Sequence, residues 1–443
     1  MPEAPPRIAS AQSIFRSAMR IRTEIAWVAA GKAVEFMAAF GLLKVLTARL
    51  GAAPYGEYNL ADTSLVLLHA IALVPVHESF LRAYHGARDS GDLRAEMRTL
   101  IRGYALVTVS VACIAIVSSP WLAGPLGFHT WTAAAAGLVF FFDRWRFLGL
   151  DYRNIRRERR SAALQAGGFQ LSLLAAILAA VIWIPTASAA LFAYAAMAAC
   201  WAALGLRRPL TEFRALPPST SRKLRGMVVA FGIPLAAVLA LQWFQSFGDR
   251  YLLKGLLDAK TVGLYVAAYQ VSGIPYTLMF RVCHELVVPI AYERAGDGSD
   301  PARLQAGDML LLELFAIQLT IGAALLLFYA EFGARFVVLL TSSEFALPGS
   351  LVLALACARW VQNLGFALQP IFALHHRTRA LLGFRLFGAV VSVSFAAIGI
   401  RKGGALGAAI GSASALLLYL AALILAPGGV VSLVRGARRQ RQP

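Results

Sequence analysis

Residues 49–58 read RLGAAPYGEY, and residues 256–265, which lie 207 positions further along the chain, read LLDAKTVGLY. The same offset aligns a wider set of matching residues. They are Gly56 with Gly263, Tyr58 with Tyr265, Leu46 with Leu253, Leu50 with Leu257, Ala52 with Ala259, and His77-Glu78 with His284-Glu285. A mostly apolar chain built from two related halves is typical of membrane carriers, in which a central path runs between two lobes.

The composition also indicates a membrane protein. Of the 443 residues, 59% are hydrophobic and only 15% are charged, which is too apolar for soluble domains. Apolar stretches repeatedly reach the roughly 20 residues that cross a bilayer as a helix. Twelve spans are expected, at 25–46, 59–81, 103–120, 130–149, 163–184, 187–206, 227–247, 263–290, 308–330, 347–374, 381–400 and 405–426.

The distribution of positive charge predicts the orientation of these spans. With the amino terminus in the cytoplasm, the connections on that side carry 31 of the 42 Lys and Arg residues, the opposite connections carry 7, and four lie within spans. This asymmetry follows the positive-inside rule and places both termini in the cytoplasm. The basic loop RWRFLGLDYRNIRRERR, at 144–160, is therefore expected to lie on anionic headgroups, and nucleic-acid binding is not expected.

We expect an all-α polytopic membrane protein, with about 12 transmembrane helices in two pseudo-symmetric six-helix bundles around a central cavity. Residues 207–226 contain paired prolines and a Ser/Thr cluster, which are typical of a linker. The expected segments are a basic cytoplasmic tail at 1–24, an N-lobe at 25–206, this cytoplasmic linker, a C-lobe at 227–426 and a basic cytoplasmic tail at 427–443. The abundance of Arg, Ala and Gly favours a bacterial inner membrane as the location.

Two segments resemble Wzx-type polysaccharide flippases. Residues 249–280, DRYLLKGLLDAKTVGLYVAAYQVSGIPYTLMF, are similar to the start of the second half of that family, and VVPIAYERAG at 287–296 also matches. LLKVLTARLGAAPYGEYNLADTSL, at 42–65, resembles the corresponding first-half segment. These flippases belong to a superfamily that also contains multidrug and toxin extruders and peptidoglycan-lipid flippases.

The resemblance implies a function. It implies two bundles of six helices forming a V, whose cavity opens alternately inward and outward. It also implies translocation of an isoprenoid diphosphate-linked oligosaccharide to the outer face, for surface polysaccharide or lipopolysaccharide biosynthesis. Neither the glycan nor the diphosphate can cross hydrocarbon unaided, so the carrier must supply a polar cavity with cations.

The tenth span offers candidate ligands for such a substrate. Arg359, Gln362 and Asn363 follow the i, i+3, i+4 spacing and so share one helical face. The arginine could bind a phosphate of the diphosphate, and the two amides could bind sugar hydroxyls. The alternative is that Arg359 forms an interhelical clamp with a glutamate elsewhere in the bundle.

The eighth span repeats this spacing with Arg281, His284 and Glu285. We expect Arg281 to assist in binding the diphosphate, although it could also neutralise Glu285 along the helix. The equivalent pairs, His77-Glu78 and His284-Glu285, are candidates for ion coupling or gating because a histidine beside a carboxylate can titrate near neutral pH. The alternative is that these side chains reach the interface or lock the inward gate.

Polar side chains also mark the first and seventh spans. Lys32 and Glu35 lie one turn apart, and Glu35 aligns with Gln242, which Gln245 follows by three residues. We place all four on the cavity wall, with Lys32 as a diphosphate ligand, Gln242 and Gln245 as sugar ligands and Glu35 as a coupling residue. Lys32 and Glu35 could instead form a local pair. Asp249-Arg250 is expected to tie the outer end of its helix.

No motif for ATP hydrolysis or for hydrolase catalysis is present, and the sequence indicates neither a cofactor nor a metal site. The expected partners are the lipid-linked oligosaccharide, membrane lipids, a coupling proton or sodium ion, and a polysaccharide polymerase with glycosyltransferases. One rival function is extrusion of cationic drugs by the same scaffold, for which the deep cations are unfavourable. The other is a membrane-embedded glycan polymerase or glycosyltransferase, which would need a large outer loop.

Overall fold

The protein is described by a computed structural model that covers residues 11–126, 129–213, 222–296 and 300–439, and this part of the chain contains helices and no strand. The first group of helices comprises α1 (Ala11–Leu50), α2 (Ala52–Leu68), α3 (Val74–Ser90), α4 (Leu93–Leu126), α5 (Thr130–Ile155), α6 (Arg159–Trp183) and α7 (Ala187–Phe213). The second comprises α8 (Arg222–Met227), α9 (Ile233–Leu256), α10 (Ala259–Ala295), α11 (Pro301–Leu340), α12 (Gly349–Ala367), α13 (Gln369–Leu374), α14 (Thr378–Leu425) and α15 (Val430–Arg439).

Helix ends follow the local chemistry of the sequence. Gly51, at φ 75°, separates α1 from α2, because glycine adopts this left-handed conformation without steric cost. The Asp258 carboxylate caps α10 by accepting a hydrogen bond of 2.7 Å from the Thr261 N–H. Within α14 the non-helical residues Gly403 and Gly404 break the helix into two antiparallel halves.

Two π-helical turns, His69–Leu73 and Val228–Gly232, join α2 to α3 and α8 to α9. A proline follows shortly after each of them, and a residue without an N–H disturbs the normal hydrogen-bond register. The second of these turns packs against the start of α3, since a Cβ on Gly232 would lie 2.7 Å from Pro75 Cα. Here α8 and the start of α9 reach across to α3.

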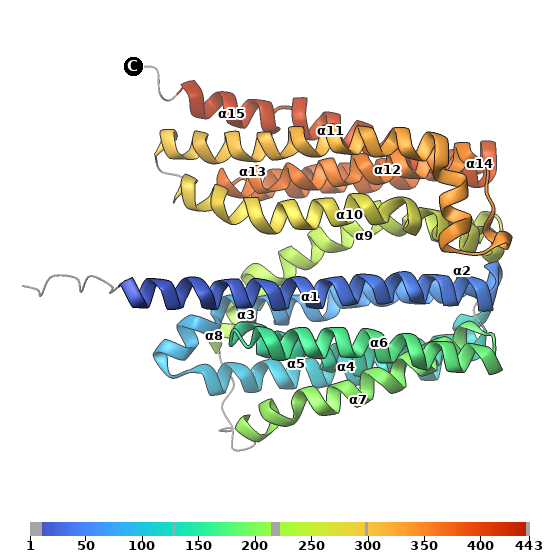
Figure 1. The fold of residues 1–443 in the computed structure, drawn as a ribbon, viewed down its shortest axis with the longest axis horizontal. Helices are drawn as coiled ribbons and strands as arrows, with labels where there is room; N and C mark the ends of the chain where they lie inside the picture. The colour runs from blue at the N-terminus through green and yellow to red at the C-terminus, as the bar shows by residue number, and fades with distance from the viewer. Residues whose placement is uncertain (1–10, 127–128, 214–221, 297–299, 440–443) are drawn as a thin grey trace, which may run out of the picture.

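The helices form two bundles, with α1–α7 in one and α9–α14 in the other (Figure 1). In the described chain, nine segments are long and apolar enough to span a membrane, and one of these contains both halves of α14. Counting the two halves of α14 separately gives ten spans. α1 and α5, which run alongside them, bring the number to the twelve expected. The start of α1 and the end of α15 lie at the same end of the molecule, which we name the terminal end; the opposite end is the far end (Figure 1).

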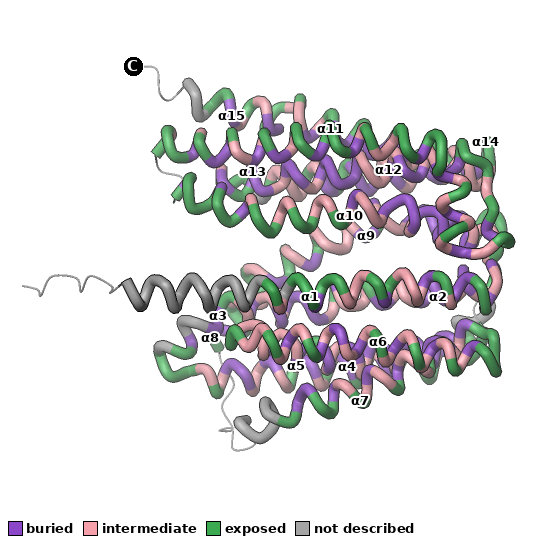
Figure 2. The backbone as a smooth tube through the Cα atoms, viewed as in Figure 1, coloured by how far each residue is buried: buried purple, intermediate pink, exposed green. Residues whose placement is uncertain are grey.

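The outward surfaces of the bundles are apolar, as a bilayer requires. Buried residues lie between the helices, and exposed ones line the outside (Figure 2). Large hydrophobic side chains are among the most exposed, including Trp183 at 85% and Leu327 at 74%. Apolar area of this extent would be a liability in water, and it is the expected lipid-facing surface of a multi-pass membrane protein.

The repeated motif forms the closest contact between the bundles, near the far end. A Cβ on Gly56 of α2 would overlap the Ala259 carbonyl oxygen, and a Cβ on Gly263 of α10 would overlap the Ala52 carbonyl oxygen. Since Gly56 aligns with Gly263 and Ala52 with Ala259, the two halves of the contact are equivalent. The repeat thus produces a pseudo-two-fold seam, which we name the glycine seam, where only glycine allows the backbones to meet.

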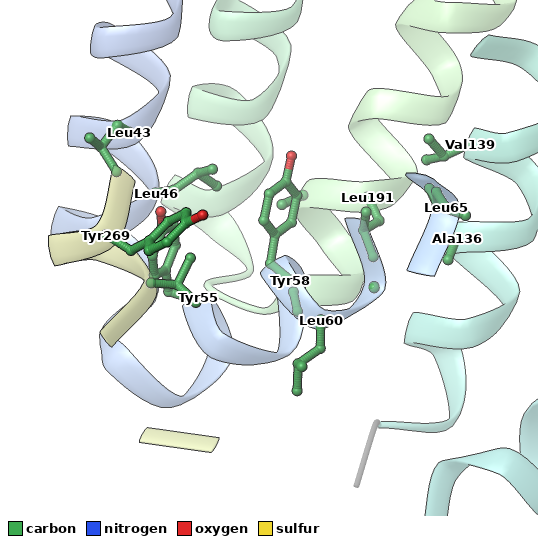
Figure 3. Packing of buried hydrophobic residues seen from close by; sticks show 14 of the residues in the cluster. Leu43, Leu46, Tyr55, Tyr58, Leu60, Leu65, Ala136, Val139, Leu191 and Tyr269 are labelled. Carbon is green, nitrogen blue, oxygen red and sulfur yellow. The ribbon is translucent and has the colours of Figure 1, made fainter. Parts of the chain in front are cut away.

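Aromatic and aliphatic side chains pack beside this seam. Figure 3 shows Tyr269 of α10 close to Leu46 of α1 and Tyr55 of α2. Tyr55 Oη donates to Gln270 Oε1 at 3.1 Å, and Gln270 Nε2 donates to Asn59 Oδ1 at 2.9 Å, so α2 and α10 are also joined by side-chain hydrogen bonds. The far end of the molecule is therefore closed by contacts from both bundles.

Several details differ from the sequence predictions. α1 begins at Ala11, well before the predicted span, and part of the predicted linker, residues 214–221, lies outside the described residues. Arg250 lies beyond the predicted span 227–247, and Arg385 lies close to the start of the span 381–400, but both are within helices, α9 and α14, at 3% and 0% exposure. A hydropathy profile ends a span at a charged residue, whether that side chain faces water or the protein interior. It therefore cannot identify buried arginines near the end of a helix.

Candidate functional site

The candidate site is a cavity between the two bundles, on the terminal side of the glycine seam. It contains about 990 Å³ of empty space, part of which is open to solvent. Its walls come from α1, α2, α9, α10 and α12. The lining residues are Phe36, Ala39, Phe40, Leu43, Asp62, Thr63, Val66, Phe247, Arg250, Tyr269, Gln270, Gly273, Ile274, Thr277, Arg281 and Arg359. The predicted central cavity is therefore present, and both bundles contribute to it.

Arg359 is held in this wall by neutral groups. Its guanidinium donates to Tyr269 Oη at 2.9 Å, to Thr277 Oγ1 at 2.8 Å and to Gln362 Oε1. The guanidinium carbon also lies 4.7 Å from the centre of the Tyr269 ring. No carboxylate of the described residues forms an ion pair with Arg359, so the interhelical clamp with a glutamate is not formed.

Two further arginines line the same cavity. Neither forms an ion pair with a described carboxylate, although Asp62 is close enough to Arg250 for their charges to interact. Arg281 is exposed and forms no ion pair with Glu285, so the local neutralisation considered above is not formed. Arg250 is buried between aromatic rings, with its guanidinium carbon 4.7 Å from the Phe247 centroid and 5.0 Å from that of Tyr269. Its Nε has no hydrogen-bond partner.

The sequence analysis expected Arg250 only to tie the outer end of its helix. In the structure its neighbour Asp249 ties this end of α9 to other helices. The Asp249 carboxylate accepts hydrogen bonds from Tyr265 Oη at 2.6 Å and from Ser412 Oγ at 3.3 Å. Arg250 instead faces the cavity, one residue further around the helix. Arg250 follows Gln242 by eight residues and so lies about 80° further around the helix, which is why the polar positions of the seventh span did not indicate this placement.

The charge of the cavity is unbalanced. Among its lining residues Asp62 is the single carboxylate, against three guanidinium groups, and it forms no ion pair with any described residue. The remaining wall is largely apolar and aromatic, with Phe36 and Phe40 contributed by α1. Positive groups in a partly dry cavity keep much of their electrostatic strength, because less water screens them.

Gln362 and Asn363 do not line the cavity, in contrast to the prediction that they bind sugar. Both are 4% exposed. The Gln362 amide accepts from Arg359 and donates to Ser246 Oγ at 2.8 Å, whereas Asn363 Nδ2 donates to the Arg359 carbonyl at 2.7 Å. The shared helical face was identified correctly, but the amides use it to position the arginine.

Gln242 and Gln245 are also directed elsewhere than predicted. Their Oε1 atoms accept hydrogen bonds from Arg385 of α14, at 3.3 Å and 3.0 Å respectively. Gln245 is buried inside the second bundle, while Gln242 lines a separate cavity of about 810 Å³ together with His284 and Gln369. The sequence could not reveal this arrangement, because Arg385 lies 140 residues away from Gln245.

Lys32 and Glu35 form the local pair that was the alternative interpretation. Lys32 Nζ lies 2.9 Å from Glu35 Oε2, and the two side chains are 57% and 24% exposed. Neither lines the cavity. Lys32 precedes the cavity residue Phe36 by one helical turn and so lies on the same face of α1, nearer the terminal end.

The two His-Glu pairs have different surroundings, despite their equivalent places in the repeat. His77 is buried inside the first bundle, where Nδ1 lies 2.6 Å from Tyr104 Oη and Nε2 lies 3.1 Å from Asp151 Oδ2. His284 is half-buried and lies beside the Phe280 ring, at 5.0 Å between centroids. Glu78 is half-buried and Glu285 is exposed, and neither lines the central cavity. Any coupling through these pairs would therefore be asymmetric.

Solved structures of membrane transporters have the same arrangement of helices. An inward-facing multidrug resistance MATE family transporter of the MOP superfamily matches with a TM-score of 0.66 and 15% identity, covering 94% of this chain and 100% of the other. The lipid II flippase MurJ, in an inward closed conformation, matches with a TM-score of 0.68 and 11% identity over 94% of this chain and 91% of the other.

A MOP superfamily transporter from Pyrococcus furiosus, described by a reversed polarity of its binding pocket, matches with a TM-score of 0.63 and 14% identity over 95% and 94% of the two chains. The chain has the fold of MOP superfamily transporters. No protein-family model and no curated protein sequence matches it. At these identities the likeness establishes the fold, and the substrate must be argued from the cavity.

Proposed function

We propose that this protein is a flippase, which moves a lipid diphosphate-linked oligosaccharide from the cytoplasmic to the outer leaflet by alternating access. The observation that carries the proposal is the presence of Arg250, Arg281 and Arg359 in one inter-bundle cavity that holds a single carboxylate, Asp62, with no ion pair between these arginines and any described carboxylate. Unpaired guanidinium groups are costly inside a membrane, and a diphosphate offers negative charge and pairs of oxygen atoms to which the planar guanidinium can donate two hydrogen bonds.

The other features of the cavity fit the same substrate class. Arg359 is held in the cavity wall by Tyr269, Thr277 and Gln362, which fix the position of its guanidinium before substrate binds. Aromatic side chains such as Phe36 and Phe247 offer flat apolar surfaces against which sugar rings or an isoprenoid chain can pack. The lipid tail would leave the cavity between the bundles, toward the apolar outer surface.

Extrusion of cationic drugs on the same fold is the rival function. A cationic substrate would require a cavity dominated by acids, and Asp62 is the single carboxylate in the lining. Pocket polarity is also the property from which the Pyrococcus furiosus transporter was suggested to have a different function. By this criterion the present cavity favours an anionic substrate.

The proposed setting is the inner membrane of a bacterium, with both termini and hence the terminal end in the cytoplasm. In this setting the closed glycine seam faces outward, and the described conformation presents its cavity toward the side where the substrate is made. A proton or sodium ion would couple transport, and a polymerase with glycosyltransferases would act on the same glycan.

The test uses a strain that lacks this gene. Complete lipid-linked oligosaccharide units should accumulate while surface glycan is lost, and the wild-type gene should restore both. Arg359→Gln should weaken the apparent affinity about 10- to 150-fold, as loss of a charged hydrogen-bonding group implies. Arg401→Gln is the control, because this exposed arginine lies outside the cavity. Normal surface glycan with new sensitivity to cationic drugs would refute the proposal and favour the extruder.

A further inference from the structure

Arg385 is a fully buried charged side chain of the second bundle, and it does not line the central cavity. It is 0% exposed and lies on the first half of α14. Its guanidinium donates to the Oε1 atoms of Gln245 at 3.0 Å and Gln242 at 3.3 Å. None of the carboxylates in the described chain forms an ion pair with it.

Neutral amide oxygens cannot balance this charge. A guanidinium has five N–H donors, and two contacts to neutral acceptors leave a full positive charge in a region of low dielectric constant. Removing one partner from a buried charge is strongly destabilising, and native proteins normally bury charges only with a counter-charge. The positive charge of Arg385 is therefore not balanced by any described residue.

The surrounding unsatisfied atoms are all hydrogen-bond donors or able to act as donors. Arg385 Nε, Gln245 Nε2 and the Tyr419 hydroxyl are buried without a partner. Tyr419 lies against the guanidinium, with 5.7 Å between the Arg385 guanidinium carbon and the ring centroid. Water could accept only some of these hydrogen bonds, and it would leave the charge uncompensated, whereas an anion would satisfy both needs.

The site is small. A Cβ on Gly388 would lie 2.6 Å from Tyr419 Cδ2 and 2.7 Å from Gln245 Nε2, so these two side chains converge on the glycine backbone. The Phe366 ring closes another side, with its centroid 5.2 Å from the guanidinium carbon. Packing this close favours a monatomic anion over a phosphate or a carboxylate, which would need more room.

We propose that the second bundle holds a chloride ion bound by Arg385, Gln245 and Tyr419. The ion would join α9 to both halves of α14 and would be separate from the transported substrate. Gln242, which is a neighbour of the site, also lines the cavity of about 810 Å³ described above, and this cavity gives an ion a route toward the guanidinium. The inference does not depend on which substrate is transported.

A chloride titration of the full-length protein in detergent tests this site. The melting temperature should rise by up to about 3 °C between 1 and 100 mM chloride, with gluconate keeping the ionic strength constant, and above the dissociation constant it should rise with the logarithm of the chloride concentration. Arg385→Met should abolish this rise, whereas Arg359→Met should retain it because that arginine lies in the central cavity. Equal melting temperatures in chloride and gluconate would overturn the proposal.

A second measurement does not depend on the folding of a variant. Crystals of the wild-type protein grown in sodium bromide should show an anomalous peak beside Arg385 Nε. Tyr419→Phe, which removes only the hydroxyl, should raise the half-saturating chloride concentration roughly three- to tenfold. Anomalous peaks confined to Arg250, Arg281 and Arg359 would assign halide binding to the central cavity and exclude the proposed site.

Discussion

Substitution of Gly263 by alanine should open the far end of the molecule. The new Cβ would lie 2.8 Å from the Ala52 carbonyl carbon, 3.0 Å from the Gly56 amide nitrogen and closer still to the Ala52 carbonyl oxygen. All three are backbone atoms, so no side chain can turn away to make room. Restoring ordinary contact distances requires the backbones of α2 and α10 to separate by roughly 1 to 2 Å.

This separation costs free energy only when the seam is closed. Overpacking a well-packed contact typically costs about 1–3 kcal/mol. A difference of this size between two conformations corresponds to a shift of about 5- to 150-fold in their ratio. The population with an open far end should therefore rise by this factor, and a carrier that alternates between two states should spend less time open at the terminal end.

Distances between spin labels on the two bundles measure this shift. Cysteines at Ala53 and Lys260 are suitable, because both positions are exposed and they begin α2 and α10 beside the seam. The four native cysteines, two of which are exposed, are replaced by serine first. The wild-type background should show a short distance, and Gly263→Ala should add a longer one.

A matched control keeps the interpretation specific. Gly255 lies near the end of α9, and a Cβ there would have no neighbour within 4 Å, so Gly255→Ala should leave the distances unchanged. The reasoning is refuted if Gly263→Ala shows the wild-type distance distribution and the wild-type melting temperature. Such a result would mean that the seam deforms locally and does not control the separation of the bundles.

Two smaller predictions concern residues that support these structures. Gln362→Leu should weaken substrate binding about 5- to 10-fold, since Arg359 loses one acceptor that positions it, whereas Asn363→Ala should stay within about twofold in the same binding titration. Asp258→Ala should lower the free energy of unfolding by about 1 kcal/mol in a denaturant titration, because it removes the cap of α10. The Thr261 N–H that donates to Asp258 holds the pKa of this carboxyl below its usual value, so the stabilisation is complete above the unfolded-state pKa and is lost as the pH falls through the folded-state pKa. A wild-type pH dependence in Asp258→Ala would contradict this assignment.

The number and type of the spans could be predicted from the sequence alone, because each span is recognised from the apolar residues of its own segment. A span of apolar residues must become a helix in a bilayer, where each backbone group has to find its partner within the segment. The repeat gave two related halves, and Arg359, Gln362 and Asn363 were correctly placed on one face by helical periodicity. The repeat did not indicate that its two copies, in α2 and α10, would contact each other.

The tertiary structure decided which polar side chains line the cavity and which form hydrogen bonds to other buried polar side chains. Gln362 positions Arg359, and Gln245 serves Arg385, whereas Arg250 turned out to line the cavity. A polar side chain within a membrane span needs a hydrogen-bond partner. The helical period shows on which face of its helix the side chain lies, but not which residue of a neighbouring helix it meets. That depends on how α9, α12 and α14 pack, and contacts between residues more than 100 positions apart leave no mark on a single sequence.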